Sequence, residues 1–244
     1  MFGDDKISVN ALHYNFKILQ MKKSSSLIIL VFALFQIVFI GCQQKEISNI
    51  NDLDRLLQGN KRFLENHPIH PDQTLERLRN LKKGQHPFAV IVSCSDSRLP
   101  TELVFDQGLG DLFVIRNAGN IISDYELGSI EYAVEHLDTK LIVVLGHTEC
   151  GAIGAFIEHQ KDTIPNHIQK IIDYLKEEPE EKLINEKTKS YYDKAVDANI
   201  IHGVEVIKKS EPILAEFIKS KKVKIVGMKY HLNDGSVTIL ENEK

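Results

Sequence analysis

The chain has 244 residues, of which 43% are hydrophobic, so it is long enough for one domain of roughly 200 residues with a sizeable core and an additional N-terminal segment. Its formal net charge is −4, which gives no indication of a nucleic-acid partner. The three cysteines are too few for a disulfide framework, which excludes the small disulfide-stabilised domains.

The beginning of the chain has the pattern of a targeting segment. Residues 1–20 have mixed polarity without a clear period, and we interpret them as an upstream extension ahead of a true start at Met21. Lys22 and Lys23 precede an apolar run at residues 27–40. This run is shorter than the roughly 20 residues of a membrane-spanning helix. It fits the hydrophobic region of a signal peptide instead.

Gly41 and Cys42 end the apolar run, and the chain becomes polar immediately afterwards. A glycine before a cysteine at this place resembles the end of a bacterial lipoprotein signal. Residues 21–42 would then be the signal segment, and Cys42 would carry the lipid. We therefore expect residues 43–244 to form the folded domain, lipid-anchored on the periplasmic side of a bacterial cell envelope. An uncleaved membrane anchor is the alternative, and it also places the domain outside the cytoplasmic membrane.

Two amphipathic helical patterns precede the first predicted strand. Apolar residues recur at helical spacing over residues 50–66, and residues 74–83 form a second helical segment. Neither helix has an assigned partner within the chain, so packing against a second subunit is one use for them. A turn at residues 84–87, which contains Gln85, leads into the strand.

Two continuous apolar runs, at residues 88–93 and 141–146, predict strands that are buried within a parallel sheet. Cys94 follows the first run, and His147 and Cys150 follow the second. Ligands of open α/β sheets bind at the carboxyl ends of the strands, so these three side chains are expected to form one site. Two thiolates and an imidazole leave one position of a tetrahedral zinc ion open, which is typical of catalytic zinc sites.

The remaining segments alternate between strand and helix. Further strands are predicted at residues 112–116, 222–230 and 236–240, with a hairpin turn before the last one. Further helices are predicted at residues 101–107, 123–137, 151–159, 164–190 and 195–219, with a break at Pro212. The order predicts an α/β fold with a central, mostly parallel β-sheet, flanking helices and a C-terminal antiparallel edge strand.

Three motifs resemble those of the β-class carbonic anhydrases. They are Cys-Ser-Asp-Ser-Arg at residues 94–98, Arg-Asn-Ala-Gly-Asn at 116–120 and Gly-His-Thr-Glu-Cys-Gly at 146–151. The resemblance covers roughly residues 50–240. It implies that residues 43–244 are a catalytic domain that reversibly hydrates carbon dioxide to bicarbonate and a proton through zinc-bound hydroxide. It also implies one Zn²⁺ per chain, bound by Cys94, His147 and Cys150.

The resemblance assigns roles to further residues. Asp96 and Arg98 would be the catalytic pair, because an arginine beside a carboxylate keeps it ionised and oriented. In the family the same aspartate can instead bind zinc and close the site at rest, and the sequence leaves both states open. The resemblance also implies a homodimer or a higher homo-oligomer. Four positions match the family's substrate pocket, with the glutamine contributed across the dimer interface: Gln85, Phe113, Tyr132 and Gly151.

Two other functions remain open at this stage. The same zinc site could hydrolyse a related linear substrate, such as carbonyl sulfide or carbon disulfide, and pocket access would decide between the substrates. The chain could alternatively be a non-catalytic zinc or thiol-redox protein, since Cys94 and Cys150 without metal are oxidisable outside the cytoplasm. The carboxylate of Asp96 argues against this alternative, because a purely structural zinc ion needs no carboxylate beside an open position.

Overall fold

A five-stranded β-sheet forms the centre of the described chain. The computed structural model describes residues 51–180 and 190–240, and we describe the unit that begins at Asp52. In their order across the sheet, the strands are β2 (Leu112–Asn117), β1 (Ala89–Cys94), β3 (Leu141–His147), β4 (Lys224–Tyr230) and β5 (Val237–Leu240). The first four are parallel, and β5 is antiparallel to β4, which confirms the predicted sheet and its edge strand.

The order of the strands places a topological switch point between β1 and β3. Every residue of these two strands is buried, as expected for continuous apolar runs in the middle of a parallel sheet. From β1 the chain proceeds to β2 on one side and then returns to β3 on the other. Ligands of open α/β sheets bind at such a switch point, outside the carboxyl ends of the two strands. The polar residues that follow β1 and β3 therefore meet there.

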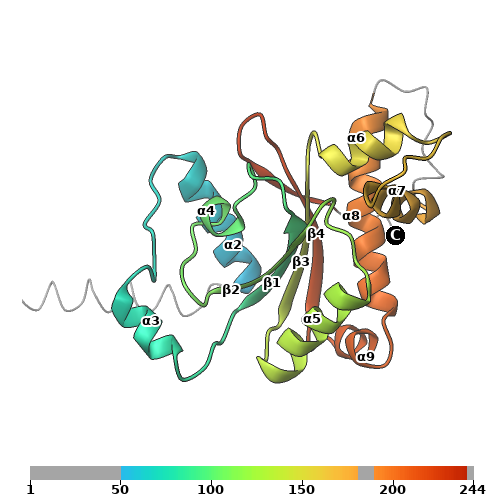
Figure 1. Cartoon of the computed structure of the whole chain (residues 1–244). Helices are drawn as coiled ribbons and strands as arrows, with labels where there is room; N and C mark the ends of the chain where they lie inside the picture. The colour runs from blue at the N-terminus through green and yellow to red at the C-terminus, as the bar shows by residue number, and fades with distance from the viewer. Residues whose placement is uncertain (1–50, 181–189, 241–244) are drawn as a thin grey trace, which may run out of the picture. The chain divides into compact units, whose positions relative to one another are not determined.

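Helices cover both sides of the sheet. Figure 1 shows α2 and α4 on one side and α5, α8 and α9 on the other. The helices are α2 (Asp52–Leu64), α3 (Leu75–Leu81), α4 (Thr101–Val104), α5 (Asp124–His136), α6 (Gly151–Glu158), α7 (Ile168–Glu177), α8 (Tyr191–Lys209) and α9 (Ile213–Lys219). The helix predicted at residues 195–219 is two helices, and Pro212 is the N-cap of the second, which confirms the break.

Helix α8 packs closely against the sheet because small residues leave room at the contact. A Cβ atom on Gly203 of α8 would lie 3.2 Å from a methyl group of Val144 in β3. A Cβ atom on Gly146 would lie 2.6 Å from the side chain of Ile200. This close approach brings the buried face of α8 next to the carboxyl end of β3.

The predictions for the N-terminal region concern residues outside the described ranges. These are the extension at residues 1–20, the signal segment at residues 21–42 and the lipidation site at Cys42. Within residues 51–180 and 190–240, no helix has both the length and the apolar character needed to cross a membrane.

Candidate metal centre

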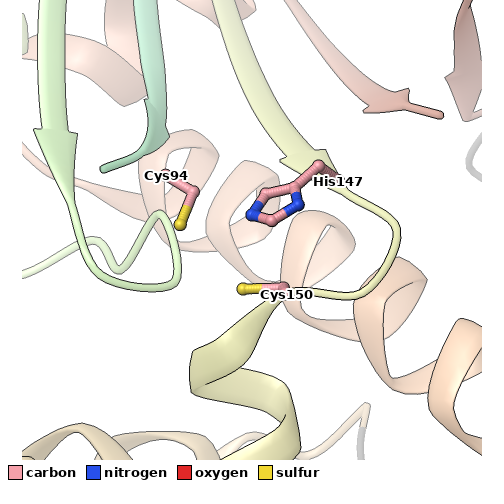
Figure 2. Close-up of side chains that lie close together, drawn as sticks. All are labelled: Cys94, His147 and Cys150. Carbon is pink, nitrogen blue, oxygen red and sulfur yellow. The ribbon is translucent and has the colours of Figure 1, made fainter. Parts of the chain in front are cut away.

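Three predicted ligands converge at the carboxyl edge of the sheet. Cys94 is the last residue of β1, His147 is the last residue of β3, and Cys150 is the N-cap of α6. All three side chains are buried, and their ligating atoms lie within 4.8 Å of one another. Figure 2 shows the two sulfur atoms and the imidazole ring facing a common point. Two thiolates and an imidazole in this arrangement form a donor set that zinc favours.

The imidazole of His147 is oriented for metal binding. Its Nδ1 lies 2.8 Å from the carbonyl oxygen of Thr148. Because a carbonyl can only accept, Nδ1 carries the proton and Nε2 keeps its lone pair. Nε2 is buried and has no hydrogen-bond partner among the described residues. A buried nitrogen without a partner is costly unless a ligand satisfies it, so a metal ion fits this position.

The two neighbouring thiols shift each other's pKa in opposite directions. A hydrogen bond from Cys150, together with weaker contributions from neighbouring groups, lowers the pKa of Cys94 to about 4. The same bond to Cys94, together with burial, raises the pKa of Cys150, although the backbone at the start of α6 acts in the opposite direction. Burial lowers the pKa of His147, but the adjacent Cys94 outweighs it, and the pKa lies above its ordinary value. Cys94 is therefore the more acidic thiol, and binding of a metal to both sulfur atoms must release the proton that Cys150 retains.

Asp96 and Arg98 form a bidentate pair beside the cluster. Nε and Nη2 of Arg98 donate to the two carboxylate oxygens of Asp96 at 3.0 and 2.9 Å. The backbone N–H of Arg98 donates to the same carboxylate. These hydrogen bonds lower the pKa of Asp96 to about 2. Oδ2 of Asp96 lies 3.9 Å from Nε2 of His147, so the ionised carboxylate faces the ligands while Arg98 holds it.

Three of the residues predicted for the substrate pocket lie away from this cluster within one chain. Phe113 pairs with Val90, four residues before Cys94, which corresponds to about 13 Å along the strand. Tyr132 packs against Phe113 with ring centroids 6.3 Å apart, and it is 49% exposed. Gln85 is exposed and precedes β1, at the opposite end of the strand from Cys94. Their role in a pocket stays a prediction that requires a second subunit.

The fourth predicted pocket residue, Gly151, lies next to the cluster. It is the first residue of α6 and follows Cys150 directly. Apart from its chain neighbours and the backbone of its own helix, no heavy atom of the described residues lies within 4 Å of where its Cβ atom would be. The structure therefore places Gly151 beside open space at the edge of the cluster.

Three contacts at the cluster are absent from the sequence-based prediction. The backbone N–H of Gly119 donates to Sγ of Cys94 at 3.4 Å, and Nδ2 of Asn199 donates to the carbonyl of Gly119 at 2.8 Å. The hydroxyl of Tyr192 donates to the carbonyl of Cys150. Asn199 had a recognisable signal, since it is a polar residue on the buried face of a helix. The contact of Tyr192 had none.

Comparison with known proteins gives a consistent result. Residues 89–237 match the family model described as carbonic anhydrase. Carbonic anhydrase 2 of Mycobacterium tuberculosis is 38% identical over 189 residues, which cover 77% of this chain and 90% of the relative. A carbonic anhydrase of Mycolicibacterium smegmatis is 38% identical over 186 residues, covering 75% of this chain and 89% of the relative.

Solved structures of β-carbonic anhydrases share the fold. A tetrameric enzyme from Sordaria macrospora superposes with a TM-score of 0.60 at 28% identity, covering 68% of this chain and 86% of that chain. The Coccomyxa enzyme in complex with acetazolamide gives a TM-score of 0.61 at 27% identity, covering 78% of this chain and 86% of that chain. The family model, the relatives and the shared fold together establish that this chain belongs to the carbonic anhydrase family, in its β class.

Proposed function

We propose that the protein catalyses the zinc-dependent, reversible hydration of carbon dioxide to bicarbonate and a proton. The observation that carries this proposal is the convergence of Cys94, His147 and Cys150 beside the Asp96–Arg98 pair. Two thiolates and one imidazole would hold the zinc ion. When bound, the ion supplies an open coordination position at which water becomes acidic enough to ionise near neutral pH.

Asp96 and Arg98 would orient the reacting water. Arg98 keeps Asp96 ionised, and an ionised carboxylate only accepts hydrogen bonds. Each carboxylate oxygen has two acceptor positions. Oδ1 of Asp96 accepts from both Nε and the backbone N–H of Arg98, whereas Oδ2 accepts only from Nη2 and keeps one position for a water molecule at the cluster. By accepting a hydrogen bond from the water, the carboxylate would orient the molecule so that a lone pair of the water oxygen stays free to attack the substrate. Arg98 is half exposed, so the pair lies where a small substrate can arrive from solvent.

We further propose that the active enzyme is a homodimer or a larger homo-oligomer. Gln85, Phe113 and Tyr132 lie away from the cluster of their own chain, which leaves a second copy as the place where they could form a pocket. Helix α3 supports such an assembly, since it contains no buried residue and exposes Leu75 and Leu78. Exposed apolar side chains of this kind indicate a contact surface.

Stopped-flow measurement of carbon dioxide hydration by the full chain, with zinc content determined on the same sample, tests the function. We expect one zinc ion per chain and fast hydration near neutral pH or at about pH 8.5. Cys150→Ser should lose both zinc and activity, because it removes one of the ligands. One zinc ion per chain without hydration at either pH would reject the proposal and direct the assay to carbonyl sulfide and carbon disulfide. Absence of zinc would favour the thiol-redox alternative.

We also propose that Cys42 is lipidated and anchors the enzyme on the periplasmic side of the cell envelope. The support comes from the sequence, in which two lysines, an apolar run and Gly41 precede Cys42. Labelling with a radioactive fatty acid in a bacterial host should mark the wild type and leave Cys42→Ser unlabelled. Equal labelling of both proteins would contradict lipidation at this residue.

A further inference from the structure

The loop that follows β2 contacts Cys94 and approaches the first turn of α6. Its Gly119 donates a backbone hydrogen bond to Sγ of Cys94 at 3.4 Å. Gly119 has a φ of 82° and Asn120 a φ of 44°, which is a pair of consecutive left-handed conformations. A Cβ atom on Gly119 would lie 2.8 Å from Cβ of Ala152 in α6. The backbone of the loop is therefore close to both Cys94 and α6, in a conformation that needs support from its surroundings.

Support comes from two directions. On the distal side, the amide of Asn117 accepts from the N–H of Ile121 and donates to its carbonyl, each at 2.8 Å. At Gly119 itself, the carbonyl accepts from Nδ2 of Asn199 at 2.8 Å. Asn199 comes from the middle of α8, which is 80 residues further along the chain. The contact therefore couples a helix behind the sheet to Gly119, the residue whose N–H contacts Cys94.

The surroundings of Asn199 make this contact firm. The side chain is 3% exposed, and it lies on the buried face of α8 together with Val196 and Ile200. A buried amide must be hydrogen-bonded, and the carbonyl of Gly119 satisfies part of this requirement. Close packing of α8 against β3 at Gly203 leaves little room for the side chain to move.

We propose that Asn199 is a positioning residue of the metal centre: by holding the carbonyl of Gly119 it fixes the backbone conformation of this residue, and so keeps the N–H on its other side pointed at the Cys94 sulfur. This inference rests on the proposed zinc site. A hydrogen bond from a backbone N–H to a thiolate stabilises the anion and fixes the direction of its lone pairs. Without Asn199, the left-handed pair of residues can relax, and Cys94 loses both effects. The competing explanation is that Asn199 only satisfies a buried carbonyl and so contributes stability alone.

The test compares the full-length Asn199→Leu variant with wild type in metal binding rather than in turnover. Leucine has a similar size but no donor. We expect zinc affinity, measured by competition with a chromogenic chelator, to fall about 10- to 100-fold, as is usual when a partner of a ligand is lost. We also expect the sulfur-to-cobalt charge-transfer band of the Co²⁺-loaded protein to shift, because Cys94 is the affected ligand.

Asn60→Leu is the matched control. Asn60 is also a buried asparagine, and its Nδ2 donates to the carbonyls of Val104 and Gly235, away from the cluster. This variant should lose thermal stability while its zinc affinity and cobalt spectrum match wild type. If Asn199→Leu behaves in the same way, Asn199 is merely structural and the inference is overturned.

A second variant keeps the test decisive if leucine prevents folding. Asn199→Ala adds no bulk at this packed contact and has no group that could donate to the carbonyl of Gly119, so the same weakening of zinc binding is expected. Unchanged zinc affinity in this variant would overturn the inference. The wild-type protein distinguishes failure of the proposed function from failure of the role of Asn199. If it binds zinc but does not hydrate carbon dioxide, the proposed function is rejected, while the comparison of zinc affinity among the variants stays valid. A wild type that binds neither zinc nor cobalt rejects both.

Discussion

At the scale of single residues, the proposed chemistry depends on how the carboxylate of Asp96 is held. Arg98 contacts it through two side-chain nitrogens and one backbone N–H, all within 3.0 Å. The pair is partly exposed, and an ordinary surface ion pair contributes only about 0–1 kcal/mol to stability. Its position beside His147 fits the role in catalysis proposed above better than a role in folding.

Replacement of Asp96 by asparagine tests this role. Asp96→Asn keeps the size of the side chain but removes the charge and replaces an acceptor with a donor. We expect kcat/KM for carbon dioxide hydration to fall about 100-fold, since positioned proton acceptors contribute at least this much. Zinc content should not change, because Asp96 is not one of the three ligands. Stopped-flow assays and metal analysis on one sample measure both quantities.

The control for this substitution is Asp138→Asn. Asp138 forms an exposed ion pair with Lys140 and lies outside the cluster, so its variant should retain the wild-type rate. Full activity in Asp96→Asn would show that the carboxylate takes no part in catalysis.

The site was predictable where its residues follow directly from strand ends. Cys94 and His147 terminate apolar runs, and parallel pairing of β1 with β3 places such ends together. The contact between Asn199 and Gly119 was not predictable, because it depends on how closely α8 packs against the sheet. No local sequence pattern predicts the distance between a helix and the sheet on which it packs.

At the scale of elements, a buried carboxylate fixes the segment between α2 and α3. Asp106 is 2% exposed, and it accepts hydrogen bonds from the backbone N–H groups of Ile69 and His70 at 3.0 Å. Nε of Arg62, in the last turn of α2, donates to the same carboxylate at 2.6 Å. Burial raises the pKa of Asp106, but these hydrogen bonds outweigh it, so the pKa lies below its ordinary value.

Asp106→Asn should therefore destabilise the protein in a pH-dependent way. Removing one partner of a buried pair costs about 3 kcal/mol, and we expect this loss in the free energy of unfolding near neutral pH. A carboxyl with a lowered folded pKa adds stability above its unfolded pKa of about 3.9 and loses it as the pH falls through the folded value. The difference between wild type and variant should accordingly shrink below about pH 4.

Urea unfolding over a series of pH values measures this difference. Asp138→Asn is again the control, because its carboxylate is exposed and its loss should change the free energy of unfolding little at any pH. A difference for Asp106→Asn that stays constant into the acidic range would contradict the assignment of stability to the ionised carboxylate.

Element boundaries show where the sequence pattern is weak. Helix α8 begins at Tyr191, four residues before its predicted start, because the apolar spacing that marks its core-facing side begins only at Ala195. The mostly parallel sheet and its antiparallel edge strand were predicted correctly, because continuous apolar runs and a hairpin turn are local signals. The first turn of a helix lacks the apolar spacing that marks the rest of the helix when the side chains of that turn are partly exposed.

At the scale of the whole molecule, the catalytic site is expected to be divided between subunits. The cluster lies at the carboxyl ends of the strands, whereas Gln85 precedes β1 at the other end. A contribution of Gln85 to catalysis thus requires the cluster of another copy. A symmetric dimer would supply it reciprocally, with each subunit completing the site of the other.

Subunit mixing distinguishes this arrangement from a self-contained site. A Cys94→Ser chain lacks a complete ligand set but keeps Gln85, and a Gln85→Ala chain keeps the ligands but lacks the amide. Each variant alone should be weakly active.

Co-expression with two different affinity tags allows the mixed oligomer to be isolated. In this oligomer the intact metal centre of one chain meets the Gln85 of the other. We expect the mixed oligomer to be more active, per intact centre, than the Gln85→Ala protein. If Gln85 instead acts within its own chain, every intact metal centre of the mixed oligomer still lacks the amide of Gln85. The mixed oligomer and the Gln85→Ala protein would then be equally active per intact centre, and this result would reject the shared site.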